Sequence, residues 1–440
     1  MDEAAEDQRL ASSCFRKVAW RSLPLLGLGY LFAYMDRVNI GFAAAQMNAD
    51  LGFSAAVYGM GGGLFFLSYA LMEVPSNLLM QRFGARLWIG RIMLTWGVLA
   101  AATMFVRTPW QFYAMRLLLG AAEAGFFPAV IVYLSYWFPL ERRSRALSLF
   151  YVAFPLSSVV MGALAGSLLN LNGLFHLHGW QWLLLAEGLP AALLSVAIFA
   201  WLPDRPENVD WLSAEEKSWL QARLAVHPES GDDENPPAIV EVLTHPRVLW
   251  LGLVNALFLG TGYAFTLTAP QVLGLRTGLS LTSVGYLVSL GGLVGAAAML
   301  GTAWLSDRRR EQFLPLIGAL IVCGASFLVL TLGTAPPAAM AGYLGYVVGG
   351  NAFNAVFMVL VSRVLRPQAL VVGCAGVNMI GQLGSFVLPT AYGLIQQQAG
   401  HLDAALPSLA PPFFIAAAII VWLRISVSRR RTPLATLAAE

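Results

Sequence analysis

This 440-residue sequence is poor in charge: charged residues make up 12% of it and hydrophobic residues 58%. A soluble chain averages about 25% charged and 45–50% apolar residues. The shortage of charge, with a mean hydropathy of +0.67, therefore indicates a polytopic membrane protein in contact with a lipid bilayer. The formal net charge is only +3, so nucleic acid is not expected as a partner.

Cysteine and lysine are also scarce. No cysteine spacing is typical of a disulfide or a zinc site, since Cys14, Cys323 and Cys374 lie in the N-terminal tail or in apolar runs. Neither Lys17 nor Lys217 ends a GxxxxGK(S/T) phosphate-binding motif, which excludes the ATP-driven pumps that use one. The sequence therefore predicts no metal, no cofactor and no enzymatic activity.

Long apolar runs, by contrast, fill the chain. The N-terminal segment MDEAAEDQ lacks the basic start of a cleaved signal peptide, so we expect the first run to act as an uncleaved insertion signal. A helix needs about 20 apolar residues to span a bilayer. About twelve runs meet this requirement: 20–47, 57–80, 87–106, 110–135, 145–169, 182–202, 247–273, 283–305, 313–334, 338–362, 370–396 and 410–428.

Basic residues gather in alternate connections between these runs. They precede the first run and follow the second, fourth, eighth, tenth and last: Arg16, Lys17, Arg21, Arg82, Arg86, Arg142, Arg143, Arg145, Arg308, Arg309, Arg310, Arg363, Arg366, Arg429, Arg430 and Arg431. The other connections carry only Arg107 and Arg276. Because cytoplasmic loops are rich in Lys and Arg, this pattern predicts a multi-pass protein of the inner membrane with both termini in the cytoplasm.

A polar segment divides the chain into two groups of six spans. We predict an N-terminal bundle over 1–202, a cytoplasmic linker over 203–246 and a C-terminal bundle over 247–440. Within the linker, 211–224 is expected to form a short amphipathic helix with Ser213 as N-cap and Glu216 three residues on. The two halves align in hydropathy as a parallel repeat, a design of secondary transporters with the substrate site near the midplane.

Four charged residues lie well inside predicted spans of the first half: Asp36, Arg37, Arg116 and Glu123. Each charge at the bilayer centre costs about 2.5–3.5 kcal/mol on insertion scales, so such groups usually face a wet cavity or an opposite charge. Arg116 and Glu123 share a helix face and lie at a depth similar to that of the other two. We expect Arg37 to face a cavity and Asp36 a neighbouring helix. The alternative is a permanent ion pair that only locks two helices.

Uncharged polar residues extend this candidate site. Tyr34 and Tyr69 are candidate cavity hydroxyls, although tyrosines in membrane spans also serve in packing. In the second half the polar residues inside spans seven to eleven are uncharged, and Asn378, Asn351 and Asn354 are the candidates for substrate hydrogen bonds. The glycines and proline around Asn378 are equally compatible with a packing role. This division predicts ion coupling in the first half and substrate hydrogen bonding in the second.

Several motifs resemble those of the anion:cation symporter family of the major facilitator superfamily. They are YMDRVNIG at 34–41, EVPSN at 73–77, RLLLGAAEAGFFP at 116–128, YWFP at 136–139, LPDRP at 202–206 and WLSAEE at 211–216. The resemblance covers nearly the whole chain and points to the bacterial branch that imports sugar acids, tartrate or aromatic carboxylates with protons. It implies substrate binding by Arg37, proton coupling by Asp36 and Glu123, and a linking role for Arg116.

We therefore expect an all-α integral membrane protein with two pseudo-symmetric six-helix bundles, the major facilitator fold. The predicted function is proton-coupled import of a small organic anion by a monomer. The two acids and two arginines sum to zero charge in the empty state, and a substrate carboxylate would release one acid to take a proton. An antiporter or exporter of an anionic or drug-like solute, and a non-transporting membrane sensor, are the alternatives.

Overall fold

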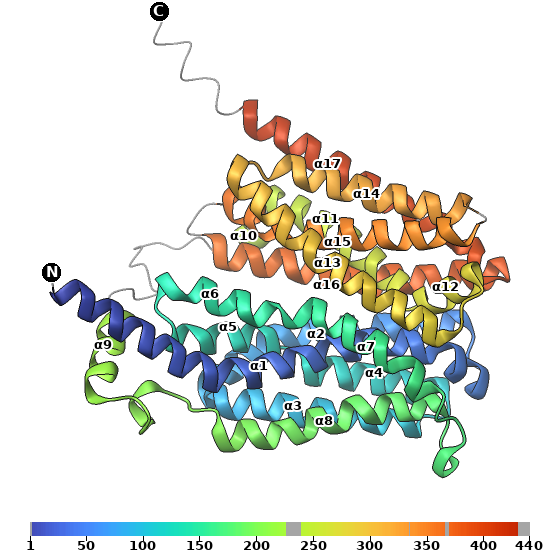
Figure 1. The fold of residues 1–440 in the computed structure, drawn as a ribbon. Coiled ribbons are helices and arrows are strands. Elements are labelled where there is room, and N and C mark those ends of the chain that lie inside the picture. Colours follow the sequence, from blue (N-terminus) through green and yellow to red (C-terminus); the bar gives the residue numbers. More distant parts are fainter. Residues whose placement is uncertain (1, 226–238, 334, 366–368, 430–440) are drawn as a thin grey trace, which may run out of the picture. The chain divides into compact units, whose positions relative to one another are not determined.

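The computed structural model describes residues 2–225, 239–333, 335–365 and 369–429, and all regular structure in these ranges is helical (Figure 1). Short 3-10 helices are η1 (Thr103–Phe105), η2 (Leu174–His176), η3 (Pro206–Asn208) and η5 (Leu402–Leu409). The α-helices are α1 (Asp2–Leu51), α2 (Ala55–Phe83), α3 (Ala85–Ala102), α4 (Pro109–Glu123), α5 (Phe126–Trp137), α6 (Leu140–Tyr151), α7 (Ala153–Leu169), α8 (Gly179–Trp201), α9 (Ala214–Ala225), α10 (Ile239–Leu243), α11 (Pro246–Thr266), α12 (Ala269–Thr277), α13 (Leu281–Arg309), α14 (Phe313–Leu332), α15 (Pro336–Val364), α16 (Leu370–Ala399) and α17 (Ala410–Arg429).

Eleven helical stretches of the described chain are long and apolar enough to cross a membrane. They coincide with the second to twelfth predicted runs. The first run lies in α1, whose apolar sequence is interrupted by Asp36, Arg37 and Asn39. The all-helical membrane fold predicted from the sequence is thus confirmed.

The chain forms two compact units. The first comprises Met1–Ile40, Ser68–Met161 and Leu168–Asp233, and the second comprises Gly41–Leu67, Gly162–Ser167 and Glu234–Glu440. Helices α1, α2 and α7 therefore each contribute residues to both units. The division of the sequence into segments 1–202, 203–246 and 247–440 stays a prediction about the order of the chain.

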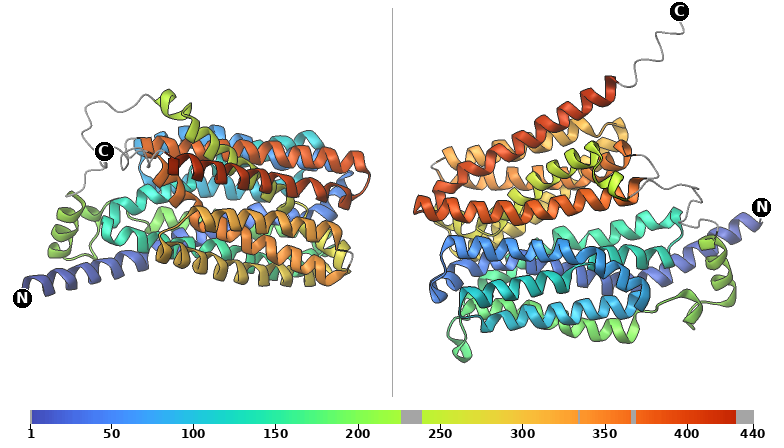
Figure 2. Two further views of the ribbon diagram at one scale, coloured as in Figure 1. Left: turned by 90° about the horizontal axis from the view of Figure 1, so that it is seen from above. Right: turned by 180° about the vertical axis from the view of Figure 1, so that it is seen from behind.

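In the first unit, α3 and α8 pack along their length, as the different views show (Figures 1 and 2). A Cβ atom on Gly97 would lie 2.5 Å from the backbone nitrogen of Ala192. One on Gly188 would lie 2.4 Å from the backbone nitrogen of Ala101. Small residues allow such close approach of membrane helices, and this contact fixes the turn of α8 that carries residue 187.

The fourth predicted span is broken between α4 and α5. Ala124 has an extended backbone (φ −55°, ψ 133°) and Gly125 has φ 87°. The Ser76 hydroxyl of α2 donates a hydrogen bond of 2.7 Å to the Ala124 carbonyl oxygen and accepts one of 3.0 Å from Nε1 of Trp88. This polar contact satisfies a carbonyl that the helix break leaves open, and it makes Glu123 the last residue of α4.

The predicted linker helix is present as α9, beside the N-terminal part of α1 in the first unit (Figure 1). Ser213 and Glu216 form the expected capping box: the Ser213 hydroxyl accepts from the Glu216 N–H at 3.1 Å, and Glu216 Oε2 accepts from the Ser213 N–H at 2.8 Å. Lys17 of α1 forms an ion pair of 2.8 Å with Glu216 Oε2, and the Ser13 hydroxyl donates to Oε1 at 2.7 Å. Although its burial acts in the opposite sense, these contacts lower the pKa of Glu216 to about 2.

In the second unit, α11 packs along α16 and α14 along α15. A Cβ on Gly260 would lie 2.3 Å from the carbonyl oxygen of Gly384, so α11 and α16 approach at backbone distance. The rings of Phe258 and Phe353 stack at 3.7 Å between centroids and join α11 to α15. The seventh span is also interrupted, since α11 ends at Thr266 and α12 begins at Ala269.

Candidate functional site

The first unit contains a buried ion pair between α1 and α4. Arg37 donates from Nε and from Nη2 to the same oxygen, Oε1 of Glu123, at 3.0 and 2.6 Å. The side chains are 10% and 1% exposed, so the pair is almost entirely removed from solvent. The other carboxylate oxygen, Oε2 of Glu123, has no hydrogen-bond partner in the described part of the chain. Arg37 therefore holds this carboxylate through one oxygen only.

Two aromatic rings lie close to the Arg37 guanidinium. Its Cζ atom lies 5.2 Å from the ring centroid of Tyr34 and 5.0 Å from that of Tyr69, within the range of cation–π attraction. Tyr69 is buried, whereas Tyr34 is half-buried and packs edge-on against Tyr30 and Phe154. The structure thus brings both predicted tyrosines close to the Arg37 guanidinium, the group that would bind an anion.

Asp36 and Arg116 are the second pair of opposite charges. Both are buried, with 2% and 5% exposure, and Arg116 exerts the largest favourable charge interaction on Asp36. The Asn39 side-chain nitrogen lies 3.4 Å from Oδ1 of Asp36, a long hydrogen bond within α1. The four charged residues predicted from the sequence therefore belong to one cluster, in which Arg37 forms an ion pair with Glu123 and the charge of Arg116 acts on Asp36.

A fifth ionisable residue, Glu187 of α8, belongs to this cluster and was missed in the sequence analysis. It is 2% exposed, and its Oε2 accepts a hydrogen bond from Nδ2 of Asn39. An acid inside the apolar run 182–202 is the same signal that singled out Asp36 and Glu123, so the sequence did contain it. With Glu187 the cluster holds three acids against two arginines, whereas the predicted sum of zero counted only two acids.

The three predicted asparagines lie in the second unit. Asn351 of α15 donates a hydrogen bond of 2.9 Å to the Val347 carbonyl oxygen of its own helix, and its amide packs against Gly295 of α13. Asn354 is exposed and Asn378 of α16 is half-buried. Asn351 thus has a helix-packing contact, whereas the other two have accessible side-chain surface for a polar ligand.

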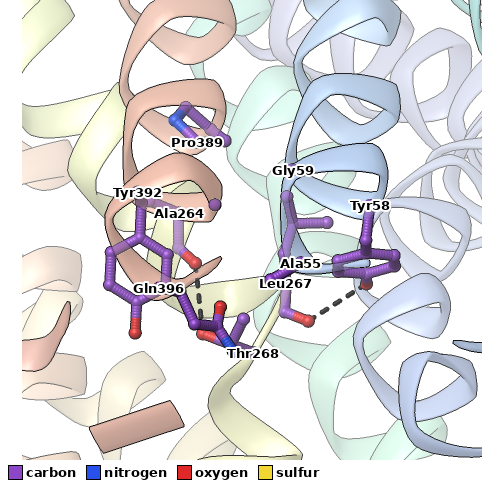
Figure 3. Close-up of a pocket in the computed structure, with 10 residues that line it drawn as sticks. Ala55, Tyr58, Gly59, Ala264, Leu267, Thr268, Pro389, Tyr392 and Gln396 are labelled. Carbon is purple, nitrogen blue, oxygen red and sulfur yellow. Dashed lines mark hydrogen bonds between the residues drawn. The ribbon is translucent and has the colours of Figure 1, made fainter. Parts of the chain in front are cut away.

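A small pocket in the second unit is lined by uncharged residues (Figure 3). The Tyr58 hydroxyl of α2 donates a hydrogen bond of 3.0 Å to the Leu267 carbonyl oxygen at the break between α11 and α12. Tyr392 and Gln396 of α16 line the same pocket. Because it offers neither acid nor base, this pocket does not supply a counter-charge for an anion.

No group of three or more His, Cys, Asp or Glu side chains suited to a metal ion occurs among the described residues. The described part of the cluster consists of carboxylates, guanidinium groups, an amide and tyrosine rings. These groups can bind an anion and hold protons, which are the requirements for coupling one to the other.

Membrane-spanning helices that bury ionisable residues of opposite charge are typical of proteins that move charged solutes across a membrane. The chain belongs to the Major Facilitator Superfamily, whose family model matches residues 26–389. The protein is therefore a multi-pass membrane transporter and not an enzyme.

Individual relatives agree with this assignment. The chain is 38% identical over 417 residues to a protein of Agrobacterium vitis named "Putative tartrate transporter", covering 94% of this chain and 92% of the relative. It is 37% identical to a "Quinolone resistance transporter" of Acinetobacter baumannii, over 95% of this chain and 96% of the relative. Among solved structures, a bacterial homologue of the human lysosomal transporter Spinster has a TM-score of 0.70 at 17% identity, covering 92% of this chain and 95% of that one.

Proposed function

We propose that this transporter imports a small organic carboxylate together with protons, by alternating access. The observation that carries the proposal is the buried ion pair between Arg37 and Glu123, with the rings of Tyr34 and Tyr69 close to the guanidinium. The Arg37 guanidinium is a planar fork of N–H donors, and this geometry matches a carboxylate. Arg37 is thus suited to exchange an internal partner for a substrate.

The exchange couples substrate to proton in two steps. A substrate carboxylate binds the Arg37 guanidinium, for which a bidentate geometry is preferred, and displaces Glu123. Glu123 is then an acid in an apolar surrounding without its counter-charge, which favours its protonated form. For a monocarboxylate, one negative charge enters with the substrate and one positive charge with the proton, so the cluster keeps its total charge; a dicarboxylate requires a second proton for the same balance. Only this neutralised, loaded state would cross between the two orientations cheaply.

Other residues of the cluster take supporting roles in this proposal. Arg116 holds Asp36 and shares a helix with Glu123, so a shift of α4 changes both acids together. Tyr34 and Tyr69 direct the guanidinium and offer hydroxyl groups to the substrate. Asn378, Asn354 and Asn351 are the proposed hydrogen-bond donors from the second half.

Tartrate is the first substrate to test, because the relative from Agrobacterium vitis carries that name. A dicarboxylate with two hydroxyl groups suits an arginine that lies close to two tyrosines. The clustering of arginine and lysine in alternate connections supports an inner-membrane location with both termini in the cytoplasm. We take the monomer as the transporting unit, since the Arg37–Glu123 pair lies within one chain.

The proposal is tested in liposomes that contain the purified protein. Radiolabelled tartrate, and then a panel of sugar acids and aromatic acids, is supplied with an inward proton gradient. We expect accumulation of at least one of these carboxylates, and its loss when a protonophore collapses the gradient. Equal accumulation with and without the protonophore, with no other ion supplied, would show that protons are not the coupling ion.

The relative named for quinolone resistance favours a second candidate, export of an anionic or drug-like solute. In that case protons and solute would move in opposite directions through the same cluster. Liposomes loaded with a fluorescent quinolone and given an outside-acidic gradient separate the two functions. Proton-driven loss of the quinolone without accumulation of any carboxylate would favour the exporter.

A further inference from the structure

Asn39 connects two buried carboxyl groups that belong to different helices. Its side-chain nitrogen Nδ2 donates to Oδ1 of Asp36 on α1 and to Oε2 of Glu187 on α8. The three residues are 1–2% exposed, so water does not surround the two acids. Two carboxyl groups joined by one amide in a buried site interact strongly, and their full ionisation is unfavourable.

Among the residues that the structure describes, no positive charge acts on Glu187. From α1 it faces Asp36 and Asn39, and Asp36 is the charged group that acts on it. From α3, the facing turn is set by Gly97 and Ala101, which pack against Gly188. Arg91, on an earlier turn of α3, has its guanidinium 4.1 Å from the ring centroid of Trp88.

Both arginines of the cluster interact with acids other than Glu187. Arg37 holds Glu123, and Arg116 acts on Asp36. Glu187 is therefore the acid without a cation of its own. A buried charge without a counter-charge costs several kcal/mol, so the neutral form of this acid is favoured.

The hydrogen-bond inventory points the same way. Oε1 of Glu187, Oδ1 of Asn39 and Oδ2 of Asp36 are all buried and all lack a hydrogen-bond partner in the described part of the chain. All three atoms are acceptors when both acids are ionised, so this part of the cluster lacks a donor. A proton on Glu187 supplies one.

We propose that Asp36 and Glu187 form a coupled carboxyl pair that shares one proton, and that this proton resides on Glu187 in the substrate-free protein. Arg116 stabilises the ionised form of Asp36, so the shared proton resides on Glu187. With it, three carboxyl groups, two guanidinium groups and one proton sum to zero. The pair thus gives the transporter a proton site besides Glu123, and its part in coupling rests on the function proposed above.

Infrared spectroscopy of the substrate-free protein tests the resting state directly. A protonated carboxyl group has a C=O stretch distinct from the bands of a carboxylate, and this stretch shifts in D₂O. We expect the difference spectrum between wild type and Glu187→Gln at neutral pH to show the loss of one such band. Glu123→Gln is the matched control and should remove carboxylate bands only. Loss of carboxylate bands in Glu187→Gln would overturn the proposal.

Two further variants test the sharing and do not depend on Glu187→Gln being stable. Asp36→Asn removes the like charge and leaves the charge of Arg116 without an acid of its own. Ionisation of Glu187 should then be easier, so the band of the protonated carboxyl group should disappear at a lower pH than in wild type. Asn39→Leu removes the shared donor, so the band should remain and move to higher frequency. An unchanged titration in the first variant, or an unchanged frequency in the second, would exclude a pair linked through Asn39.

These measurements use neither substrate nor a gradient. A failure of proton-driven import would therefore leave the infrared result intact, and a missing band would leave the import proposal intact. If both hold, Glu187→Gln should also lower the number of protons moved per substrate, measured from reversal potentials.

Discussion

Arg37 on α1 places two donors on a single oxygen of Glu123, the last residue of α4. The pair joins two helices of the first unit and leaves Oε2 of Glu123 without a partner among the described residues. A lock between helices would gain from using both oxygens, because bidentate pairs are the stronger ones. The one-sided contact is better suited to a partner that is released during transport.

Arg37→Ala should abolish the thermal stabilisation that a bound carboxylate confers, because it removes the fixed charge that binds the anion. It should also lower the free energy of unfolding by about 3–5 kcal/mol, since Glu123 is left buried without its partner. Thermal unfolding with and without the substrate measures both effects. Arg107→Ala, at an exposed position, is the control and should retain substrate stabilisation. Unchanged affinity in Arg37→Ala would remove this residue from the substrate site.

Glu123→Gln mimics the protonated acid and cannot release a proton. If Glu123 carries the coupling proton, the variant should exchange substrate across the membrane at equal proton concentrations but fail to concentrate it with a gradient. Counterflow and gradient-driven uptake on one preparation measure the two activities. Normal accumulation by the variant would move the coupling role to Asp36 and Glu187.

Gly125→Ala should destabilise the protein through the break between α4 and α5. The residue has φ 87°, and a Cβ there would lie 2.3 Å from the Ser76 hydroxyl oxygen. We expect a loss of about 1–3 kcal/mol from backbone strain alone. Gly318→Ala in α14 is the control, since a Cβ there meets nothing within 4 Å and alanine favours a helix. Equal melting temperatures for the two variants would show that the break tolerates a side chain.

Glu216→Gln should loosen α9 from α1 at neutral pH. The folded pKa of about 2 lies below the value of about 4.3 for an unfolded chain. The contribution of this carboxylate is therefore complete above about pH 5 and is lost as the pH falls towards 2. Hydrogen exchange of α9 should be faster in the variant at pH 7, and the difference should shrink below about pH 4 and be largely lost near pH 2. Glu215→Gln, exposed on the same helix, should match the wild type throughout.

Much of this architecture follows from the order of residues alone. Twelve apolar runs predict the spans because a bilayer imposes one length and one composition on any helix that crosses it. The capping box of α9 is a local pattern, so Ser213 and Glu216 predict the start of this helix from the sequence alone. Asp36, Arg37, Arg116 and Glu123 are likewise recognisable in the sequence, because a charge inside an apolar run costs free energy on insertion into the bilayer.

The partners within the cluster were decided by the tertiary structure. Sequence spacing places Arg116 and Glu123 on one face of α4, but only packing shows that Glu123 meets Arg37 while the charge of Arg116 acts on Asp36. The break after Glu123 depends on Ser76 of another helix. Glu187 shows the limit most clearly: its charge is visible in the sequence, but its lack of a cation becomes apparent only when α8 packs beside α1. Local composition thus determines which residues enter the membrane, and long-range packing determines which charges neutralise one another.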